Sequence, residues 1–433
     1  MLCRKGGGYR WSVSAIALVA LILGIYNMAH GQFVRSCEEP SPFSPVSGAG
    51  TFDVVPSMCV SERYDSNVFY RAPSPDLQRD DFVTNVNPMI RVNHNGDYAS
   101  GFLKVGGFSE TYVKNPGLNY LGTSDTLSLD LNNSIKRWLP NATLSVLDTF
   151  SYTPLPPGLV NPEAGTSPSA PANVQDELAQ GFLAFRTNKV MNNATVSTSY
   201  ATTATTSLHA IYNSTIVRFG SSSSTGGPIL FDTTSQTGTV GGEARLTEID
   251  TLKMYYSNTQ TEFASRFRSS HFVVDSATIG WSRALTPNIS AEVGGGGILI
   301  SPGLTTYAAD AALIMNFLNN RTTISYHRSA FPSFVGVGVP MVGDVFLLSA
   351  IQTLDQQWQL GEFASYSHRS GGSGLNAVTF DSYGASVDIY YWMTRIWSTA
   401  LSFDYIKFNS EFGSVTSDFD RKAITLSVRA IWG

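Results

Sequence analysis

Residues that could act as a nucleophile, a base or a metal ligand are scattered along this sequence. Beyond residue 31 the histidines stand far apart, at His94, His209, His271, His327 and His368. None lies beside a Gly-x-Ser-x-Gly segment, and Ser and Thr are so frequent that a hydroxyl near any histidine carries little information. The three cysteines lack metal-ligand spacing. We therefore expect no enzyme, no catalytic residue, no metal and no cofactor.

A second group of side chains is charged and occurs at alternate positions of otherwise apolar segments. Glu292, for example, lies between Ala291 and Val293. The whole group is Asp130, Lys253, Glu292, Glu362, Asp388, Asp404 and Arg429. Charges gathered on one face of a sheet could steer or bind ions and polar solutes. What they do depends on the elements that carry them.

The last twelve residues, 422–433, have the period of a strand with two unlike faces. One apolar row comprises Ile424, Leu426, Val428, Ala430 and Trp432. The other row is small or polar and includes Arg429. A chain that ends inside such a strand needs a partner for it, because an unpaired edge promotes association. In a membrane barrel the partner is the first strand, expected around residues 54–64; the alternative is the last strand of a soluble sandwich.

The same alternation recurs along the chain between polar connections of two kinds. Short turns lie near residues 93–96, 138–141, 201–206, 246–250, 285–288, 318–321, 354–357 and 393–396. Longer loops rich in Gly, Ser, Pro and Asn lie between them. Eight short turns and nine longer loops predict about 18 strands, with 16 as the alternative. Short turns on one side and long loops on the other are typical of outer-membrane barrels.

The N-terminus has the features of a secretory signal. Residues 1–11 are basic, residues 13–25 are almost wholly apolar, and small residues precede position 32. We expect a signal peptide over 1–31, a periplasmic linker over 32–50 and the barrel over 51–433. The periplasm permits a disulfide between Cys37 and Cys59, and two unpaired cysteines are the alternative. The loop over 154–180 lies either outside the barrel or folded into its lumen.

Composition favours the membrane barrel over the sandwich. Charged residues make up 14% of the chain, whereas soluble proteins carry about 25%. Aromatic residues cluster near the predicted strand ends, as in the girdles of membrane barrels. The net charge of −5 argues against nucleic acid as a partner.

The inside of the barrel is the safer position for the seven charged residues. A basic side chain facing lipid at mid-membrane costs ~2–4 kcal/mol. We therefore expect these residues to line the lumen, and we expect the row that includes Ile424 and Trp432 to face lipid. Rings of acid in a pore would favour cations and neutral polar solutes. The alternative is that the charges bind one another and stiffen the barrel.

Residues 61–69, Ser-Glu-Arg-Tyr-Asp-Ser-Asn-Val-Phe, resemble the opening strand of the β-barrel porin 2 family. They are also similar to outer-membrane barrels associated with exopolysaccharide and PEP-CTERM loci. There a Glu-x-Tyr-x-x-Asn-[Val/Ile]-[Phe/Tyr] segment precedes an acidic loop and an Asp-Phe-x-Thr-x-x-x-Pro strand. The matching positions here are Glu62, Tyr64, Asn67, Phe69, Asp81, Phe82 and Pro88. The resemblance implies an outer-membrane pore or scaffold, with polysaccharide export as one use, and no catalytic residues.

These observations together predict an antiparallel up-and-down β-barrel in the outer membrane of a Gram-negative cell. The expected function is a porin-like channel that passes saccharides or serves exopolysaccharide export. The competing class is a non-conducting structural or interaction barrel, a scaffold or an adhesin. The expected partners are outer-membrane lipid and lipopolysaccharide, the barrel-assembly machinery and polysaccharide-export components.

Overall fold

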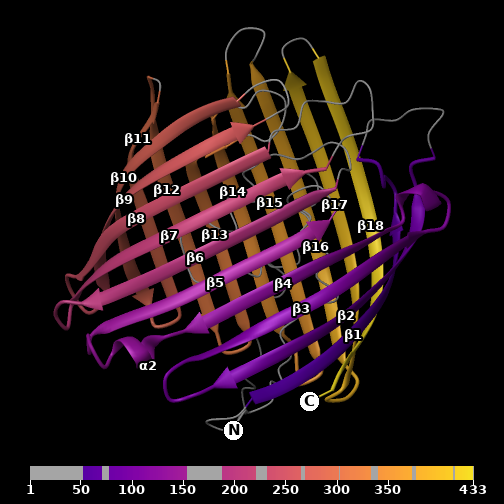
Figure 1. The fold of residues 1–433 in the computed structure, drawn as a ribbon, viewed down its shortest axis with the longest axis horizontal. Helices are drawn as coiled ribbons and strands as arrows, with labels where there is room; N and C mark the ends of the chain where they lie inside the picture. The colour runs from indigo at the N-terminus through magenta and orange to yellow at the C-terminus, as the bar shows by residue number, and fades with distance from the viewer. Residues whose placement is uncertain are drawn as a thin grey trace, which may run out of the picture.

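The computed structural model describes residues 52–70, 78–153, 188–220, 232–264, 269–301, 303–332, 340–372, 377–412 and 415–432. Strands dominate these residues (Figure 1). The first nine are β1 (Phe52–Asp65), β2 (Asp81–Asn95), β3 (Ser100–Tyr112), β4 (Tyr120–Asp130), β5 (Ala142–Thr153), β6 (Lys189–Ala201), β7 (Thr206–Phe219), β8 (Asp232–Arg245) and β9 (Asp250–Ala264). The second nine are β10 (Ser269–Thr286), β11 (Ile289–Ser301), β12 (Leu304–Phe317), β13 (Asn320–Pro332), β14 (Pro340–Thr353), β15 (Trp358–Gly371), β16 (Val378–Trp392), β17 (Trp397–Phe412) and β18 (Val415–Ile431).

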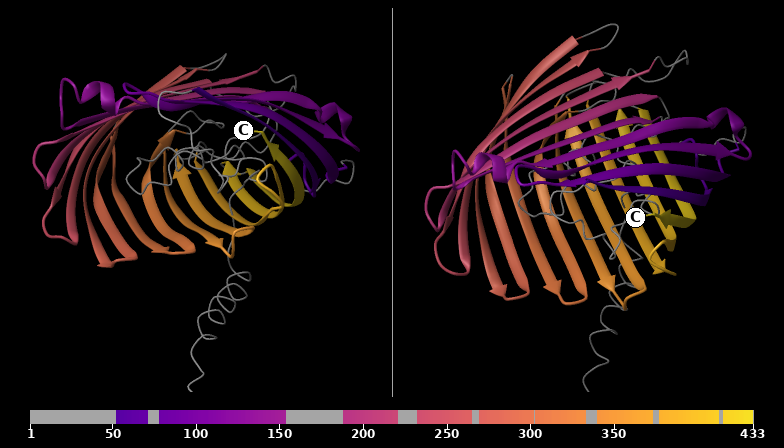
Figure 2. Two further views of the ribbon diagram at one scale, coloured as in Figure 1. Left: turned by 90° about the horizontal axis from the view of Figure 1, so that it is seen from below. Right: turned by 60° about the horizontal axis from the view of Figure 1, so that its bottom comes forward.

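The strands form one closed antiparallel barrel. Each strand pairs with the next along the chain, from the β1–β2 pair to the β17–β18 pair. β18 then pairs with β1, with Val60 opposite Val428. The view from below shows the strands arranged as a ring (Figure 2). The predicted 18 strands, and the predicted partner of the terminal strand, are confirmed.

The two ends of the barrel differ in their connections. Short turns at one end of the barrel join seven pairs of strands: β2–β3, β6–β7, β8–β9, β10–β11, β12–β13, β14–β15 and β16–β17. The start of β1 and the end of β18 lie at this same end, which is the lower one in Figure 1. The longer connections, such as the one between β1 and β2, lie at the opposite end. We call these the turn end and the loop end.

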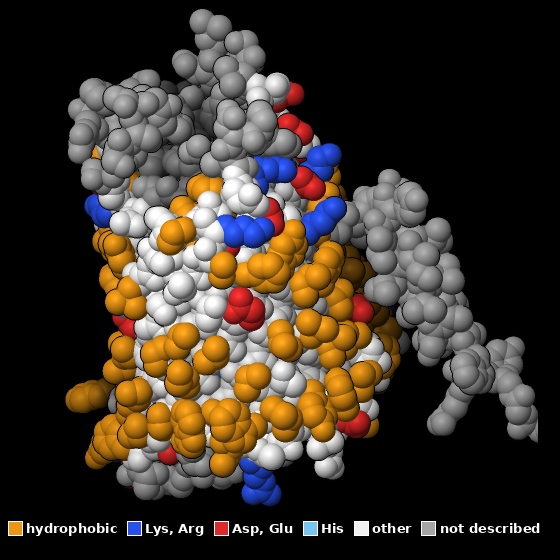
Figure 3. Space-filling model, turned by 90° about the vertical axis from the view of Figure 1, so that its right-hand side faces the viewer, with side chains coloured by type: hydrophobic (Ala, Val, Ile, Leu, Met, Phe, Trp, Pro, Cys, Tyr) orange, Lys and Arg blue, Asp and Glu red, His pale blue; other side chains and the backbone are white. Residues whose placement is uncertain are grey.

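Each strand has an apolar outer face and a more polar lumenal face. On β18 the outward Ile424, Leu426 and Val428 are 49%, 55% and 40% exposed, and the residues between them are buried. The ladder registers place the exposed apolar residues of successive strands side by side, for example Tyr64 beside Phe82 and Ile90 beside Val105. Figure 3 shows a broad apolar band toward the turn end of this side, with charged side chains gathered toward the loop end. Such an exterior is that of a membrane-spanning barrel.

Two aromatic rows mark the limits of this apolar band on β15 and β16. Near the turn end Trp358 pairs with Tyr391, with ring centroids 4.5 Å apart. Eight residues toward the loop end, Tyr366 pairs with Tyr383 at 5.0 Å. At ~3.3 Å per residue and a strand tilt of ~40°, eight residues rise about 20 Å along the barrel axis. This height is close to the ~25 Å apolar band of outer-membrane barrels.

Strand β4 ends before the alternation in its sequence does. The pattern Leu127–Ile135 continues past Asp130, but β4 ends at Asp130 and residues Asn132–Ile135 form the short helix α2. The backbone N–H and the side-chain amide of Asn132 donate to the Asp130 carboxylate at 2.8 and 2.9 Å. Asn and Asp side chains favour such local turns over continued strand. A turn of 3₁₀ helix, η1 (Pro116–Leu118), connects β3 and β4.

Several expectations concern segments of the chain that the structure does not describe. The signal peptide over 1–31, the linker over 32–50 and the loop over 154–180 lie outside the described residues. Within the described ranges, no helix is long and apolar enough to cross a membrane. Cys59, on the lumenal face of β1, is disulfide-bonded.

Candidate pore lining

The lumenal face of β5 to β9 is a wall of hydroxyl and amide side chains, which we call the hydroxyl wall. Cross-strand neighbours bond to each other: Thr143 to Ser199 and Ser145 to Ser197 at 2.6 Å, and Thr237 to Thr259 at 2.9 Å. The remaining members are Asn193, Thr195, Asn213, Thr215, Ser235 and Thr261. Neutral donors and acceptors in this density suit polar solutes without selecting the sign of a charge.

Lys253 and Glu292 form an ion pair on the lumenal face near the turn end. The Lys253 ammonium lies 2.7 Å from Glu292 Oε1, and both side chains are largely buried. Asp310 lies beside them, where Gly294 leaves room for its carboxylate; a Cβ on that glycine would lie 2.4 Å from Asp310 Oδ2. Lys253 and Glu292 thus bind each other across β9 and β11, which corresponds to the second of the two alternatives.

The other predicted acids do not form one ring. Asp388 and Asp404 are buried on the lumenal faces of β16 and β17, and they are diagonal neighbours because Asp388 pairs with Ser402. Asp130 also follows the lumenal parity but sits at the rim of the turn end, where it bonds to Asn132. The acids are therefore dispersed in height and around the wall.

Glu362 lies on the outer face, so its predicted lumenal position is wrong. It pairs with Val387 and Ala350, on the same face as the exposed Ile389. The lumenal positions of β15 are instead its odd-numbered residues, including the buried Phe363. The alternation of β15 is ambiguous because apolar residues occur on both faces, and only the register with β14 and β16 resolves it.

The terminal strand presents its apolar row outward. Ile424, Leu426 and Val428 are exposed, and Trp432 beyond the strand end is 45% exposed. Arg429 has the lumenal parity, is half-buried and pairs with Cys59 of β1.

Four buried charged residues on β1, β3 and β18 form a group that the sequence did not reveal. We call Arg63, Asp65, Glu110 and Arg421 the seam cluster. Arg421 Nε donates to both oxygens of Asp65 at 2.9 Å, and its Nη2 donates at 2.6 Å. Arg63 donates to both oxygens of Glu110 at 3.1 and 3.2 Å, and its Nε lies 3.5 Å from Asp65.

The seam cluster crosses the line where the barrel closes. Asp65 ends β1 and Arg421 lies on β18, so the pair joins residues 356 positions apart. Bidentate arginine–carboxylate geometry fixes orientation as well as distance. The cluster therefore holds the loop end of β1 against both β18 and β3, on the lumenal side.

The residues that carry the family resemblance surround this seam. Asn67 is fully buried; its N–H bonds to Asp65 and its side-chain amide to the Asp420 carbonyl, both at 3.0 Å. Asp81 is also fully buried and accepts backbone N–H bonds from Lys114 and Asn115 at 2.8 and 2.9 Å. Both side chains fix the entry and exit of the first loop.

The other motif residues belong to the walls of the first hairpin. Tyr64 and Phe82 contact each other on the outer face, with ring centroids 5.3 Å apart. Glu62, also outward, accepts a hydrogen bond from Thr84 at 2.7 Å, and Phe69 packs against a small buried apolar cluster. The β2–β3 ladder omits pairs at Asn87 and Pro88, as expected because proline lacks an N–H.

One histidine group has the composition of a catalytic triad without its geometry. Ser207 Oγ lies 2.8 Å from His209 Nε2, and Glu243 Oε2 lies 3.9 Å from that same nitrogen. A Ser–His–acid relay needs the acid on the opposite ring nitrogen. Glu243 instead accepts a 2.6 Å hydrogen bond from Tyr255. This arrangement fits a lumenal hydrogen-bond network.

The described residues contain no group of His, Cys, Asp or Glu side chains that could hold a metal ion. The carboxylate of Asp80, in the first loop, bonds to the Lys114 ammonium, and this hydrogen bond lowers the pKa of Asp80 below its usual value. The acidic residues of this loop, where described, are thus engaged within the protein.

Comparison with known proteins yields likeness of architecture only. A scan against models of known protein families finds no match, and neither does a search of curated proteins. Among solved structures, the chain is similar to OpdO of Pseudomonas aeruginosa, at 12% identity and a TM-score of 0.44, over 88% of this chain and 98% of that one. It is also similar to OccK1 (OpdK) of P. aeruginosa, at 11% identity and a TM-score of 0.44, over 88% and 99%.

A third similar structure is the siderophore receptor PirA of P. aeruginosa, at 9% identity and a TM-score of 0.43, over 89% of this chain and 81% of that one. Values this low assign neither a family nor a substrate. The resemblance of residues 61–88 to the porin 2 family stays a prediction.

Proposed function

We propose that this protein is a porin-like channel of the Gram-negative outer membrane that passes small polar solutes. The observation that carries the proposal is the division between the two faces of one closed barrel. The outer face is apolar over a height of about 20 Å, and the lumenal face of β5–β9 is a hydroxyl wall. Barrels of 16–18 strands are wide enough to enclose an aqueous channel.

Neutral saccharides are the solutes we propose for this lumen. The hydroxyl wall offers donors and acceptors that match sugar hydroxyls. The ion-paired state of Lys253 and Glu292 supports weak discrimination between cations and anions. The pore-lining role of Asp130, Asp388, Asp404 and Arg429 belongs to the same proposal.

A second candidate is a non-conducting barrel that acts as a scaffold or adhesin, within exopolysaccharide export or elsewhere. The specific observation in its favour is the extent of burial on the lumenal face near the seam. Asp65, Asp388 and Arg421 are each almost inaccessible to solvent, whereas side chains that line a wide water-filled lumen would be accessible to solvent.

Reconstitution separates the two candidates. Purified protein in planar bilayers should give stepwise conductance with a weak preference for either ion, and proteoliposomes should swell in neutral disaccharides. Thr237→Trp, on the hydroxyl wall, should lower the unit conductance severalfold. Val240→Trp on the outer face of the same strand, where Val240 is 55% exposed, is the matched control. Absence of steps in several salts, from barrels that migrate as folded, would exclude the channel and leave the scaffold.

A further inference from the structure

The outer wall of β13–β16 changes character in three successive rows toward the loop end. The lowest row is apolar: Ile324, Leu348, Ala364 and Ala385 are cross-strand neighbours. The next row is aromatic and consists of Tyr326, Phe346, Tyr366 and Tyr383. The third row carries charged and ionisable side chains and consists of Arg328, Asp344, His368 and Asp381. Lipid tails, interface and headgroups follow in this order, so the aromatic row matches the interface and the third row the headgroups of the outer leaflet.

The aromatic row is continuous. Ring centroids are 4.7 Å apart between Tyr326 and Phe346, 6.2 Å between Phe346 and Tyr366, and 5.0 Å between Tyr366 and Tyr383. Phe346, in the middle, is 48% exposed. An aromatic face carries a negative potential, so it attracts the C–H bonds on the flat side of a sugar ring.

The charged row is tied to the tyrosines below it. Tyr326 donates to Asp344 at 2.7 Å and Arg328 donates to the same carboxylate at 2.6 Å. Tyr366 and His368 both contact Asp381, at 3.2 and 2.9 Å. These bonds hold the tyrosine rings in place beside Phe346, so the aromatic row has its binding geometry before any ligand binds.

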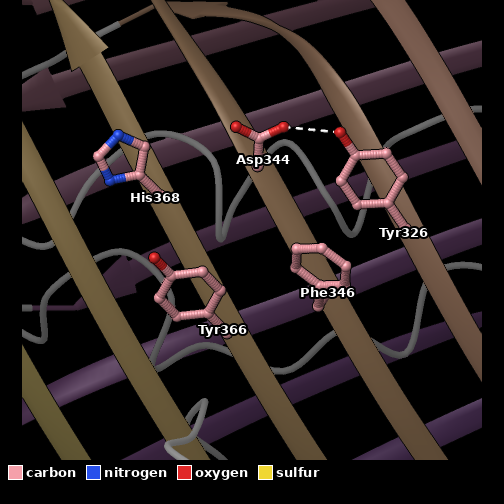
Figure 4. Close-up of a pocket in the computed structure, with 5 residues that line it drawn as sticks. All are labelled: Tyr326, Asp344, Phe346, Tyr366 and His368. Atoms are coloured by element: carbon pink, nitrogen blue, oxygen red, sulfur yellow. Dashed lines mark hydrogen bonds between the residues drawn. The ribbon is translucent and has the colours of Figure 1, made fainter.

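The two rows together border a shallow pocket that opens outward (Figure 4). It is lined by Tyr326, Asp344, Phe346, Tyr366 and His368, with a volume of about 530 Å³. Small-molecule sites span ~300–1,000 Å³. In Figure 4 Phe346 and Tyr366 lie below, on the aromatic row, while Asp344 and His368 lie above. Arg328 stands beside the pocket over the Tyr307 ring, at 4.4 Å.

We propose that this pocket binds the phosphorylated amino-sugar headgroup of an outer-leaflet glycolipid. The sugar ring stacks on Phe346 and Tyr366, Asp344 accepts from a hydroxyl or amide N–H, and Arg328 attracts the phosphate. Arginine suits phosphate because its donors are planar and paired. A phosphodiester lipid without a sugar lacks the ring that the aromatic row fits. The proposal is independent of whether the barrel conducts.

Native mass spectrometry of the detergent-solubilised barrel tests this assignment. Diphosphoryl lipid A is the probe, and phosphatidylglycerol is the anionic lipid without a sugar. The wild-type barrel should bind one lipid A at least tenfold more tightly than phosphatidylglycerol. Phe346→Ala and Arg328→Gln should each remove most of that preference, and Phe346→Trp should keep it.

Two control variants make the same substitutions at outward residues that lie away from the pocket. Phe403→Ala removes an outward phenylalanine that is 45% exposed and pairs with Val387 within the apolar band. Arg283→Gln removes an outward arginine that pairs with Asp250 near the turn end, 3.7 Å apart. Both controls should bind lipid A as the wild type does. Equal affinity for the two lipids, or equal losses in test and control variants, would show ordinary lipid contact and overturn the proposal. So would a dimer that Phe346→Ala dissociates, because a second copy would then be the occupant.

Discussion

The Asp65–Arg421 pair should be the contact on which closure of the barrel depends most. Removing one partner of a buried ion pair costs ~3–5 kcal/mol, because the other charge stays buried without compensation. Arg421→Met leaves Asp65 with the Arg63 Nε at 3.5 Å and the Asn67 N–H at 3.0 Å, so we expect a loss near ~3 kcal/mol. Asp65→Leu leaves Arg421 with the ring of Tyr70 at 5.3 Å and the charge of the buried Asp404, without a bidentate carboxylate partner, so we expect a loss near ~5 kcal/mol.

The double variant, Asp65→Leu with Arg421→Met, distinguishes a coupled pair from two separate effects. Neither charge is then left buried alone, so the double variant should be more stable than Asp65→Leu by itself. Urea unfolding of the barrel in detergent, followed by tryptophan fluorescence and by heat-modifiable migration, gives the free energies. Asp80→Asn removes the carboxylate of a solvent-accessible ion pair with Lys114 and should leave the midpoint unchanged. Losses that simply add in the double variant would refute the coupling, and with it the role of the seam cluster.

Three further predictions concern single positions. Glu362→Leu should stabilise the barrel by about 1 kcal/mol, because the carboxylate faces lipid. Glu292→Leu should destabilise it by about 2 kcal/mol, because Lys253 loses its closest partner. The same urea assay measures both free energies, and the opposite order would place Glu362 in the lumen. Arg429→Leu should reach the outer membrane at near wild-type yield and Val428→Arg at a much lower one, as quantified on immunoblots of membrane fractions; the reverse ranking would contradict the register of the closing pair. Peptide mapping without reductant should recover the Cys59 peptide linked to the cysteine of the N-terminal linker, and a free Cys59 thiol in the folded protein would contradict the disulfide.

The sequence by itself determined the architecture, because the determining signals are local. Period-two alternation, eight short turns and the terminal row from Ile424 to Trp432 give the number of strands and the need for closure. These features depend on neighbouring residues along one strand, so they can be read without knowing what lies beside it. The position of Lys253 and Glu292 on the lumenal face followed from the same parity.

Only the tertiary structure decided which side chains meet. Alternation states which residues share a face, but the face that meets lipid is set by the register with both neighbouring strands, and for Glu362 the register reversed the expected side. The seam cluster joins Asp65 to Arg421 across nearly the whole chain, and the lipid-facing pocket takes its residues from three separate strands. Such contacts arise because closure brings strand ends together at fixed heights, and no spacing along the sequence encodes those heights.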